Sequence, residues 1–175
     1  MNQETEVKIL EVDKEKIIES LKENNAEFIK NVFQKNFVYT NSHTTFNKIL
    51  VRVRDEDADV FITVKGPGEI KDNVKIREEI EFNVKDEAKI KRMLELLGFE
   101  KTKYYEYKRE YYKLEGCTVE IIEAFKVPIF LELEGTKEQI VNAANKLGYG
   151  EKDFFNGKIY DKYDAYTDNL RFEDE

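Results

Sequence analysis

The most constraining feature of this sequence is a two-residue alternation in which the second face of each strand carries charge. Between Leu50 and Arg54, valines alternate with arginines. Because successive side chains of a β-strand point to opposite sides, this segment is predicted to be a strand with one apolar and one basic face. Glutamates and lysines give the same alternation in residues 1–10, 60–65, 74–84 and 130–134. Further extended segments are expected over residues 28–40, 99–114 and 117–125.

A charged second face has two structural explanations. It can be the solvent face of an open sheet, where cross-strand ion pairs each contribute roughly 0.2–1 kcal/mol. Alternatively, the strands close into a barrel, with the apolar face packed outward against helices and the charged face lining the lumen. The recurrence of Arg-x-Arg and Glu-x-Glu over many strands favours the barrel. We therefore expect an α+β fold, a closed antiparallel β-barrel with a charged lumen and flanking helices.

Helices are expected wherever a capping residue precedes an apolar period of 3.6. Asp13, Asp86 and Thr136 each stand at such a position and are typical N-caps. The tail, residues 159–166, is expected to add a last strand or to be irregular. Two prolines and no Ser/Gly-rich linker indicate one domain over residues 1–175.

Composition excludes several classes of protein. The net charge is −8, so no global basic field attracts duplex nucleic acid. One cysteine excludes a disulfide framework and a Cys-rich zinc site, and a single histidine nearly excludes a His-based metal site or a Ser-His-Asp triad. No apolar run reaches a membrane span, and no signal peptide is visible, so we expect a cytoplasmic protein without a membrane partner. The sequence leaves the oligomeric state open, a homodimer included.

The charged faces also indicate a chemistry. Several arginines and lysines on one wall form a cradle for a polyphosphate, since a guanidinium binds phosphate oxygens through two N–H groups. Paired glutamates on another wall suit a hard cation such as Mg²⁺ or Mn²⁺, which takes oxygen ligands and bridges phosphates. Neither feature requires histidine or cysteine.

The charged motifs of these strands resemble those of a known family. The opening Glu4-Thr5-Glu6-Val7-Lys8 is similar to the Glu-x-Glu-x-Lys signature of the CYTH family, the triphosphate tunnel metalloenzymes. Further motifs follow in the family's order: Leu50-Val51-Arg52-Val53-Arg54, Thr63-Val64-Lys65, Arg77-Glu78-Glu79-Ile80-Glu81, Lys108-Arg109 and Phe130-Leu131-Glu132-Leu133-Glu134. The resemblance ends near Tyr160 and so covers most of the chain.

The resemblance implies an eight-stranded tunnel and assigns roles to its residues. The metal ligands would be Glu4, Glu6, Glu132 and Glu134. The substrate-binding residues would be Lys8, Arg52, Arg54, Lys65, Arg77, Lys108 and Arg109. The residues expected to take part in catalysis are Glu4, Glu6, Lys8 and Arg54.

Three functions remain open at this stage. The first is metal-dependent hydrolysis of inorganic triphosphate, thiamine triphosphate or a nucleoside triphosphate. The second is that of a class IV adenylyl cyclase, which converts ATP to cyclic AMP and pyrophosphate through the ribose hydroxyl. The third is a polyphosphate-binding module without catalysis.

Two departures from the family pattern bear on these expectations. Members often carry an aspartate about ten residues before the last Glu-x-Glu, where this chain has Ile122. Either one metal ligand is missing or Glu120 substitutes for it. Lys108 and Arg109 are adjacent, so a regular strand can turn only one of them into the lumen.

Overall fold

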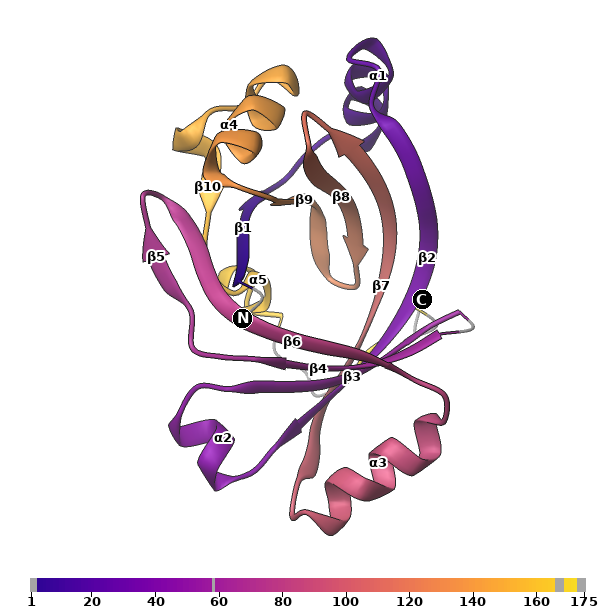
Figure 1. The fold of residues 1–175 in the computed structure, drawn as a ribbon. Coiled ribbons are helices and arrows are strands. Elements are labelled where there is room, and N and C mark those ends of the chain that lie inside the picture. Colours follow the sequence, from indigo (N-terminus) through magenta and orange to yellow (C-terminus); the bar gives the residue numbers. More distant parts are fainter. Residues whose placement is uncertain (1–2, 58, 166–168, 173–175) are drawn as a thin grey trace.

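The computed structural model describes residues 3–57, 59–165 and 169–172 (Figure 1). In chain order its main elements are β1 (Gln3–Ile9), α1 (Lys14–Glu23), β2 (Glu27–Thr40), α2 (Ser42–Phe46), β3 (Leu50–Glu56), β4 (Asp59–Lys65), β5 (Glu69–Lys71), β6 (Val74–Val84), α3 (Glu87–Leu96), β7 (Glu100–Leu114), β8 (Cys117–Ala124), β9 (Val127–Glu134) and α4 (Lys137–Lys146). The tail adds a 3₁₀ turn (Glu151–Asp153), β10 (Phe154–Phe155), α5 (Ile159–Lys162) and β11 (Asn169–Leu170).

Eight of the strands close into an antiparallel barrel, as the sequence predicts. Their order is β1-β9-β8-β7-β2-β3-β4-β6, and β6 pairs again with β1 to complete the ring. At this closure Glu4 lies opposite Arg77, and Glu6 lies opposite Lys75. The fold is therefore α+β, with helices outside a closed barrel.

The larger hydrophobic core lies outside the barrel, between strands and helices. Helices α1 and α4 lie together at one end of the molecule (Figure 1). Their buried side chains, such as Leu21 and Ile140, pack with outward residues of β1, β8 and β9, including Val7, Ile121 and Leu133. All five of these side chains are at most 1% exposed. This face is where apolar burial stabilises the barrel.

A second, smaller core lies under α3 at the opposite end (Figure 1). Leu94 of this helix packs with Tyr39, Val51 and Val53 from β2 and β3. The helix begins at Asp86, whose carboxylate accepts a hydrogen bond from the Lys89 backbone N–H. Asp13 and Thr136 cap α1 and α4 in the same way, so all three expected N-caps are confirmed.

The tail is the part of the fold that the sequence predicts least well. Residues 159–162 form the short helix α5, where we expected a strand or irregular chain. Four residues are too few for an apolar period to reveal a helix. The end of that segment, Tyr166, lies outside the described residues. Among the described residues, no helix has the length and apolar character needed to cross a membrane.

Candidate functional site

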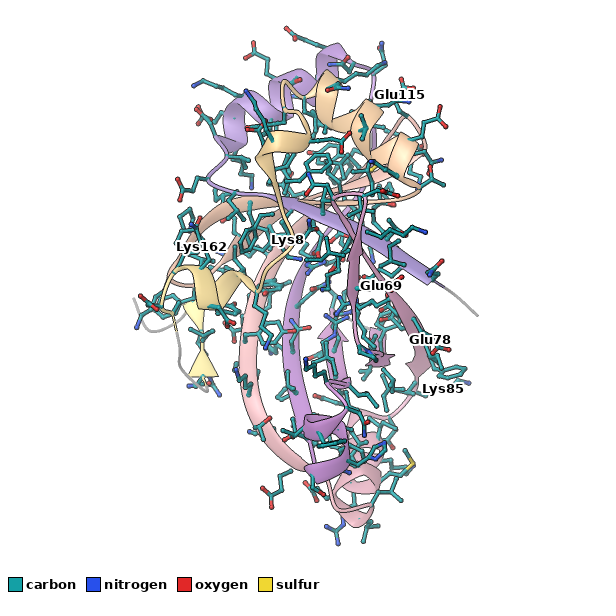
Figure 2. The ribbon with its side chains drawn as sticks, turned by 90° about the vertical axis from the view of Figure 1, so that its left-hand side faces the viewer. Lys8, Glu69, Glu78, Lys85, Glu115 and Lys162 are labelled. Atoms are coloured by element: carbon teal, nitrogen blue, oxygen red, sulfur yellow. The ribbon has the colours of Figure 1, made fainter. Side chains whose placement is uncertain are left out.

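The lumen of the barrel contains a cavity of about 1440 Å³ lined mainly by charged side chains. Figure 2 shows one of them, Lys8, toward the middle of the molecule. The closed ring brings together nearly all the residues that the sequence singles out, although they come from six strands. The lining includes Glu4, Glu6, Lys8, Arg52, Arg54, Lys65, Arg77, Arg109, Glu132 and Glu134.

Lys108 is the exception, because the structure does not place it at the lumen, where it was expected to bind substrate. Its side chain is exposed on the outer surface, with Nζ 4.5 Å from the centroid of the Phe172 ring. The cause is the alternation of a regular strand, which turns Arg109 inward and Lys108 outward.

The wall formed by β1, β4 and β6 holds its carboxylates in close ion pairs. Lys65 Nζ lies 2.7 Å from Glu4 Oε1, and Arg77 Nε lies 2.6 Å from Glu4 Oε2. Burial alone would raise the pKa of Glu4, but the charges of Lys65 and Arg77 outweigh it and lower that pKa to about 2. Glu4 is therefore ionised at neutral pH.

Glu6, the second acid of the motif, is 2% exposed and surrounded by cations. Lys75 Nζ donates a hydrogen bond to its Oε1 at 2.7 Å, and Arg77 Nη2 donates another at 3.2 Å. Burial would raise the pKa of Glu6, whereas the charges of Lys8 and Arg77 keep it below its usual range. Lys75 was not among the expected site residues. The signal was present, because Lys75 alternates with Arg77 on the same face of β6.

The wall formed by β3 and β4 presents two guanidinium groups. Arg54 Nη2 donates a 3.0 Å hydrogen bond to Glu81 Oε1, and Arg52 Nη2 lies 3.8 Å from the other oxygen of that carboxylate. Thr63 Oγ1 also donates to Glu81, at 2.6 Å. The Nε atom of Arg52 is buried and has no hydrogen-bond partner among the described residues. A buried donor without a partner costs about 1–3 kcal/mol. The hydrogen-bonding capacity of this wall is therefore not fully used within the described residues.

The wall formed by β7, β8 and β9 combines Arg109 with two glutamates. Arg109 Nη1 bonds to Glu120, and its Nη2 lies 3.4 Å from Glu132 Oε2. Lys8 approaches Glu132 from the neighbouring strand, at 3.1 Å. Glu120 thus lies in the lumen. The sequence alone left open whether Glu120 substitutes for the missing aspartate. Ile122 belongs instead to an apolar cluster with Phe130.

Three carboxyl groups of the lumen, Glu79, Glu120 and Glu134, have raised pKa values. Burial raises the pKa of Glu120 to about 7 although Arg109 lies beside it, and the charge of Glu132 adds to the effect. Burial and the neighbouring charges of Glu120 and Glu4 raise the pKa of Glu134 to about 7 as well. Carboxylate oxygens are the ligands that a hard divalent cation takes, and such a cation would offset the excess of buried negative charge.

The lumen offers suitable metal ligands without a ready-made metal centre. Among the described residues, no three acidic side chains converge closely enough to hold an ion. Glu4 and Glu6 are instead engaged by Lys65, Lys75 and Arg77. The residue types fit Mg²⁺ or Mn²⁺, but binding would require these ion pairs to loosen.

An aromatic cluster marks another part of the lumen wall. Tyr107 packs against Phe130 and, from the tail, against Tyr160, with ring centroids 6.4 and 6.5 Å away. Arg109 lies over the Tyr107 ring at 5.1 Å. The basic walls of the cavity are therefore continuous with an apolar, aromatic part of its lining.

Comparisons with known proteins agree with this architecture. The model of the CYTH domain matches residues 2–156. A relative from Methanocaldococcus jannaschii, named "putative adenylate cyclase", is 36% identical over 133 residues, which are 75% of each chain. Among solved structures, a protein from Pyrococcus horikoshii OT3 superposes with a TM-score of 0.76 at 27% identity, covering 90% of this chain and 98% of its own.

A more distant structure has the same fold. It is a "putative adenylyl cyclase" from Hippeastrum described as having a dominant triphosphatase activity. The TM-score is 0.69 at 15% identity, over 93% of this chain and 95% of that chain. The family match extends past both Glu-x-Glu motifs and includes all eight strands of the barrel. The chain belongs to the CYTH domain family.

Proposed function

We propose that this protein is a divalent-metal-dependent hydrolase of a triphosphate-bearing substrate that binds inside the barrel. The observation that supports the proposal best is the lumen itself, a large cavity with arginines and lysines on several walls and glutamates between them. Ion pairs that only stabilised the exposed face of a sheet would not need to be enclosed in a cavity. A linear triphosphate, by contrast, needs cations on several sides at once.

The basic residues are proposed to hold the phosphates. Arg52, Arg54 and Arg109 present guanidinium groups to the cavity, and Lys8 and Lys65 add point charges. Guanidinium groups fix the orientation of phosphate oxygens, whereas ammonium groups mainly contribute charge. Positioned cations also stabilise the charge that develops as a phosphoanhydride bond breaks.

The acidic residues are proposed to hold Mg²⁺ or Mn²⁺. The ligand set is Glu4, Glu6, Glu132 and Glu134, with Glu120 as an additional candidate. When bound, such a cation would offset the negative charge of the phosphates and act as a Lewis acid. That compensation is needed because nearly every lumen cation already has a carboxylate partner, so a triphosphate would otherwise bring uncompensated negative charge.

Substrate and metal binding are expected to favour each other. Lys65 and Arg77 cannot bond fully to both Glu4 and a phosphate. As phosphates draw these cations away, Glu4 and Glu6 lose their partners and become available to a metal ion. Coupling of this kind is reciprocal, so metal should tighten phosphate binding by the same factor.

Cyclisation of ATP is the alternative, and the name of the Methanocaldococcus relative favours it. The Hippeastrum protein carries a cyclase name together with a dominant triphosphatase activity, so a name does not decide between the two reactions. Both use the same phosphate contacts and differ in whether water or the ribose hydroxyl attacks. The aromatic lining near Tyr107 and Tyr160 is compatible with either.

The test is a side-by-side assay of tripolyphosphate, ATP and thiamine triphosphate with Mg²⁺ and Mn²⁺. Release of inorganic phosphate supports hydrolysis, and cyclic AMP with pyrophosphate supports the cyclase. Thermal melts run in parallel, because a ligand that binds only the folded state raises the melting temperature. A melting shift without turnover would leave a binding module. The absence of both a melting shift and turnover at about millimolar ligand would refute the tunnel as a triphosphate site.

A further inference from the structure

Glu6, a proposed metal ligand on β1, has several cations beside one of its oxygen atoms. In the described part of the chain, three cationic side chains approach its Oε1. Lys75 Nζ lies 2.7 Å away, Arg77 Nη2 lies 3.2 Å away and Lys8 Nζ lies 3.6 Å away. A divalent ion placed at this oxygen would meet three like charges at close range. It can bind there only if one of the three side chains withdraws.

Lys75 is the one of the three that can withdraw most easily. Arg77 is held by two carboxylates, because its Nε also donates a 2.6 Å hydrogen bond to Glu4 Oε2. Lys8 is shared with a second carboxylate as well. The side chain of Lys75 is 22% exposed, against 12% for Lys8 and 14% for Arg77. A lysine ammonium is also a compact charge on a flexible stem, so it exchanges partners with less reorganisation than a planar guanidinium.

The contact between Lys75 and Glu6 follows from the way the barrel closes. The two residues lie directly opposite each other in the antiparallel pair of β1 and β6. Side chains at such positions start from Cβ atoms only about 4.5–5.5 Å apart. The ion pair is therefore built into the closure of the ring, and Lys75 always lies within reach of Glu6.

The stem of Lys75 lies against the turn that follows β4. A Cβ atom added at Gly68 would lie 3.0 Å from Lys75 Cε and 3.5 Å from Lys75 Cγ. The backbone of Gly68 is not in the left-handed region, so a larger residue there would disturb the space for this stem and not the backbone. Both residues line the cavity. The ammonium of Lys75 thus lies between Glu6 and the space that a substrate would occupy.

We propose that Lys75 is the resident cation of the metal site, holding the place beside Glu6 until a divalent ion binds and then pairing with a phosphate. The inference rests on the metal binding stated in the proposed function. While the lumen is empty, Lys75 balances the buried charge of Glu6. When Lys75 turns to a phosphate oxygen, Glu6 becomes available to the metal ion. One side chain that serves both ligands couples their binding, and this coupling is reciprocal.

Calorimetric titration of Mn²⁺ into the full chain without substrate tests this competition. Lys75→Met keeps an unbranched apolar stem and removes the charge. The variant should bind Mn²⁺ about tenfold more tightly than the wild type, because a charge-assisted competitor for Glu6 is gone. Lys75→Gln, which is polar and uncharged, should give the same result, so the test does not depend on how an apolar side chain packs in the lumen.

The matched control is Lys71→Met on β5. It removes the same charge from an exposed position of the neighbouring strand that does not line the cavity. This variant should bind Mn²⁺ within about twofold of the wild type, because exposed charges are screened by solvent and salt.

The coupling between the two ligands is the second measurement. Saturating tripolyphosphate should tighten Mn²⁺ binding by the wild type, and this gain should be about tenfold smaller in Lys75→Met, since no ammonium has to leave Glu6. At saturating Mn²⁺, the variant should bind tripolyphosphate about tenfold more weakly, because it lacks the ammonium that would pair with a phosphate. A merely structural ion pair would lower the melting temperature when lost and would not raise the affinity for Mn²⁺.

The possible outcomes separate this inference from the proposed function. Equal Mn²⁺ affinity in the wild type and both Lys75 variants would overturn the role of Lys75 and leave the metal site in place. An equal gain in Lys71→Met would also overturn it, since the effect would then come from long-range charge and not from the place beside Glu6. If neither the wild type nor any variant bound Mn²⁺, with or without tripolyphosphate, the proposed metal site and this inference would fail together.

Discussion

The inner and outer faces of the same strands differ in chemistry and in what they do. On β9, outward Leu131 and Leu133 are fully buried under α1 and α4, whereas inward Glu132 faces the lumen. Burying the leucines is favourable, while burying a carboxylate costs free energy that a partner such as Lys8 must offset. The outer face therefore stabilises the fold, and the inner face is free to bind. Substitutions on the two faces should fail in different ways.

The largest expected effect is on the outer face. Leu133→Ala should lower the free energy of unfolding by about 3–5 kcal/mol, because it leaves a cavity in a well-packed core. Urea unfolding at fixed pH and salt measures this. Binding of tripolyphosphate by the fraction that stays folded should be unchanged. A loss below about 1 kcal/mol would show that this face is not the stabilising core.

The next effect is on the inner face and on turnover. Glu6→Gln keeps the size of the side chain but removes the charge expected to hold the metal ion. Metal-dependent turnover should fall about a hundredfold to a thousandfold, the range seen when one electrostatic contact at a reacting centre is lost. Initial rates over a Mg²⁺ and Mn²⁺ titration provide the measurement.

Two controls separate this loss from unfolding. Tripolyphosphate should still raise the melting temperature of Glu6→Gln, since the basic walls remain in place. Glu19→Gln, which makes the same chemical change at an exposed position of α1, should retain wild-type turnover. Wild-type rates for Glu6→Gln across the metal titration would contradict the metal assignment.

A smaller effect is expected for Arg54→Ala. Loss of a charge-assisted contact worth roughly 1.5–3 kcal/mol weakens tripolyphosphate binding by about one to two decades. The melting temperature should change little, because Glu81 keeps its hydrogen bond from Thr63 and its contact with Arg52. Calorimetric titration beside a thermal melt checks both. Weakened binding together with a collapsed melt would identify Arg54 as a structural residue instead.

The sequence predicts which residues line the lumen, and the reason is local. Period-two alternation decides the face of each side chain, so Glu4, Glu6, Arg52 and Arg54 could be placed without knowing how the strands pair. The three helix caps are equally local. The family resemblance supplied the number of strands and the assigned roles.

The partners within the lumen could not be predicted, because they depend on how the barrel closes. Glu4 meets Lys65 and Arg77 only through the pairing of β1 with β6, and these residues are far apart in the chain. The same closure decides that Lys75 engages Glu6. The ion pairs that would compete with the proposed metal binding are thus a property of the ring and not of any motif.

The smallest expected effect comes from two neighbours on β7 that differ only in the face they occupy. Lys108→Ala should alter tripolyphosphate affinity less than twofold and the free energy of unfolding by less than about 0.5 kcal/mol, as is usual for an exposed side chain. Arg109→Ala, its matched partner, should weaken binding about tenfold or more, because Arg109 lines the cavity and contacts Glu120 and Glu132. Both variants are measured by the same titration at one salt concentration, since added salt screens the attraction between the lumen and the anion. Equal losses for the two would mean that long-range charge, and not the inward face of β7, governs binding.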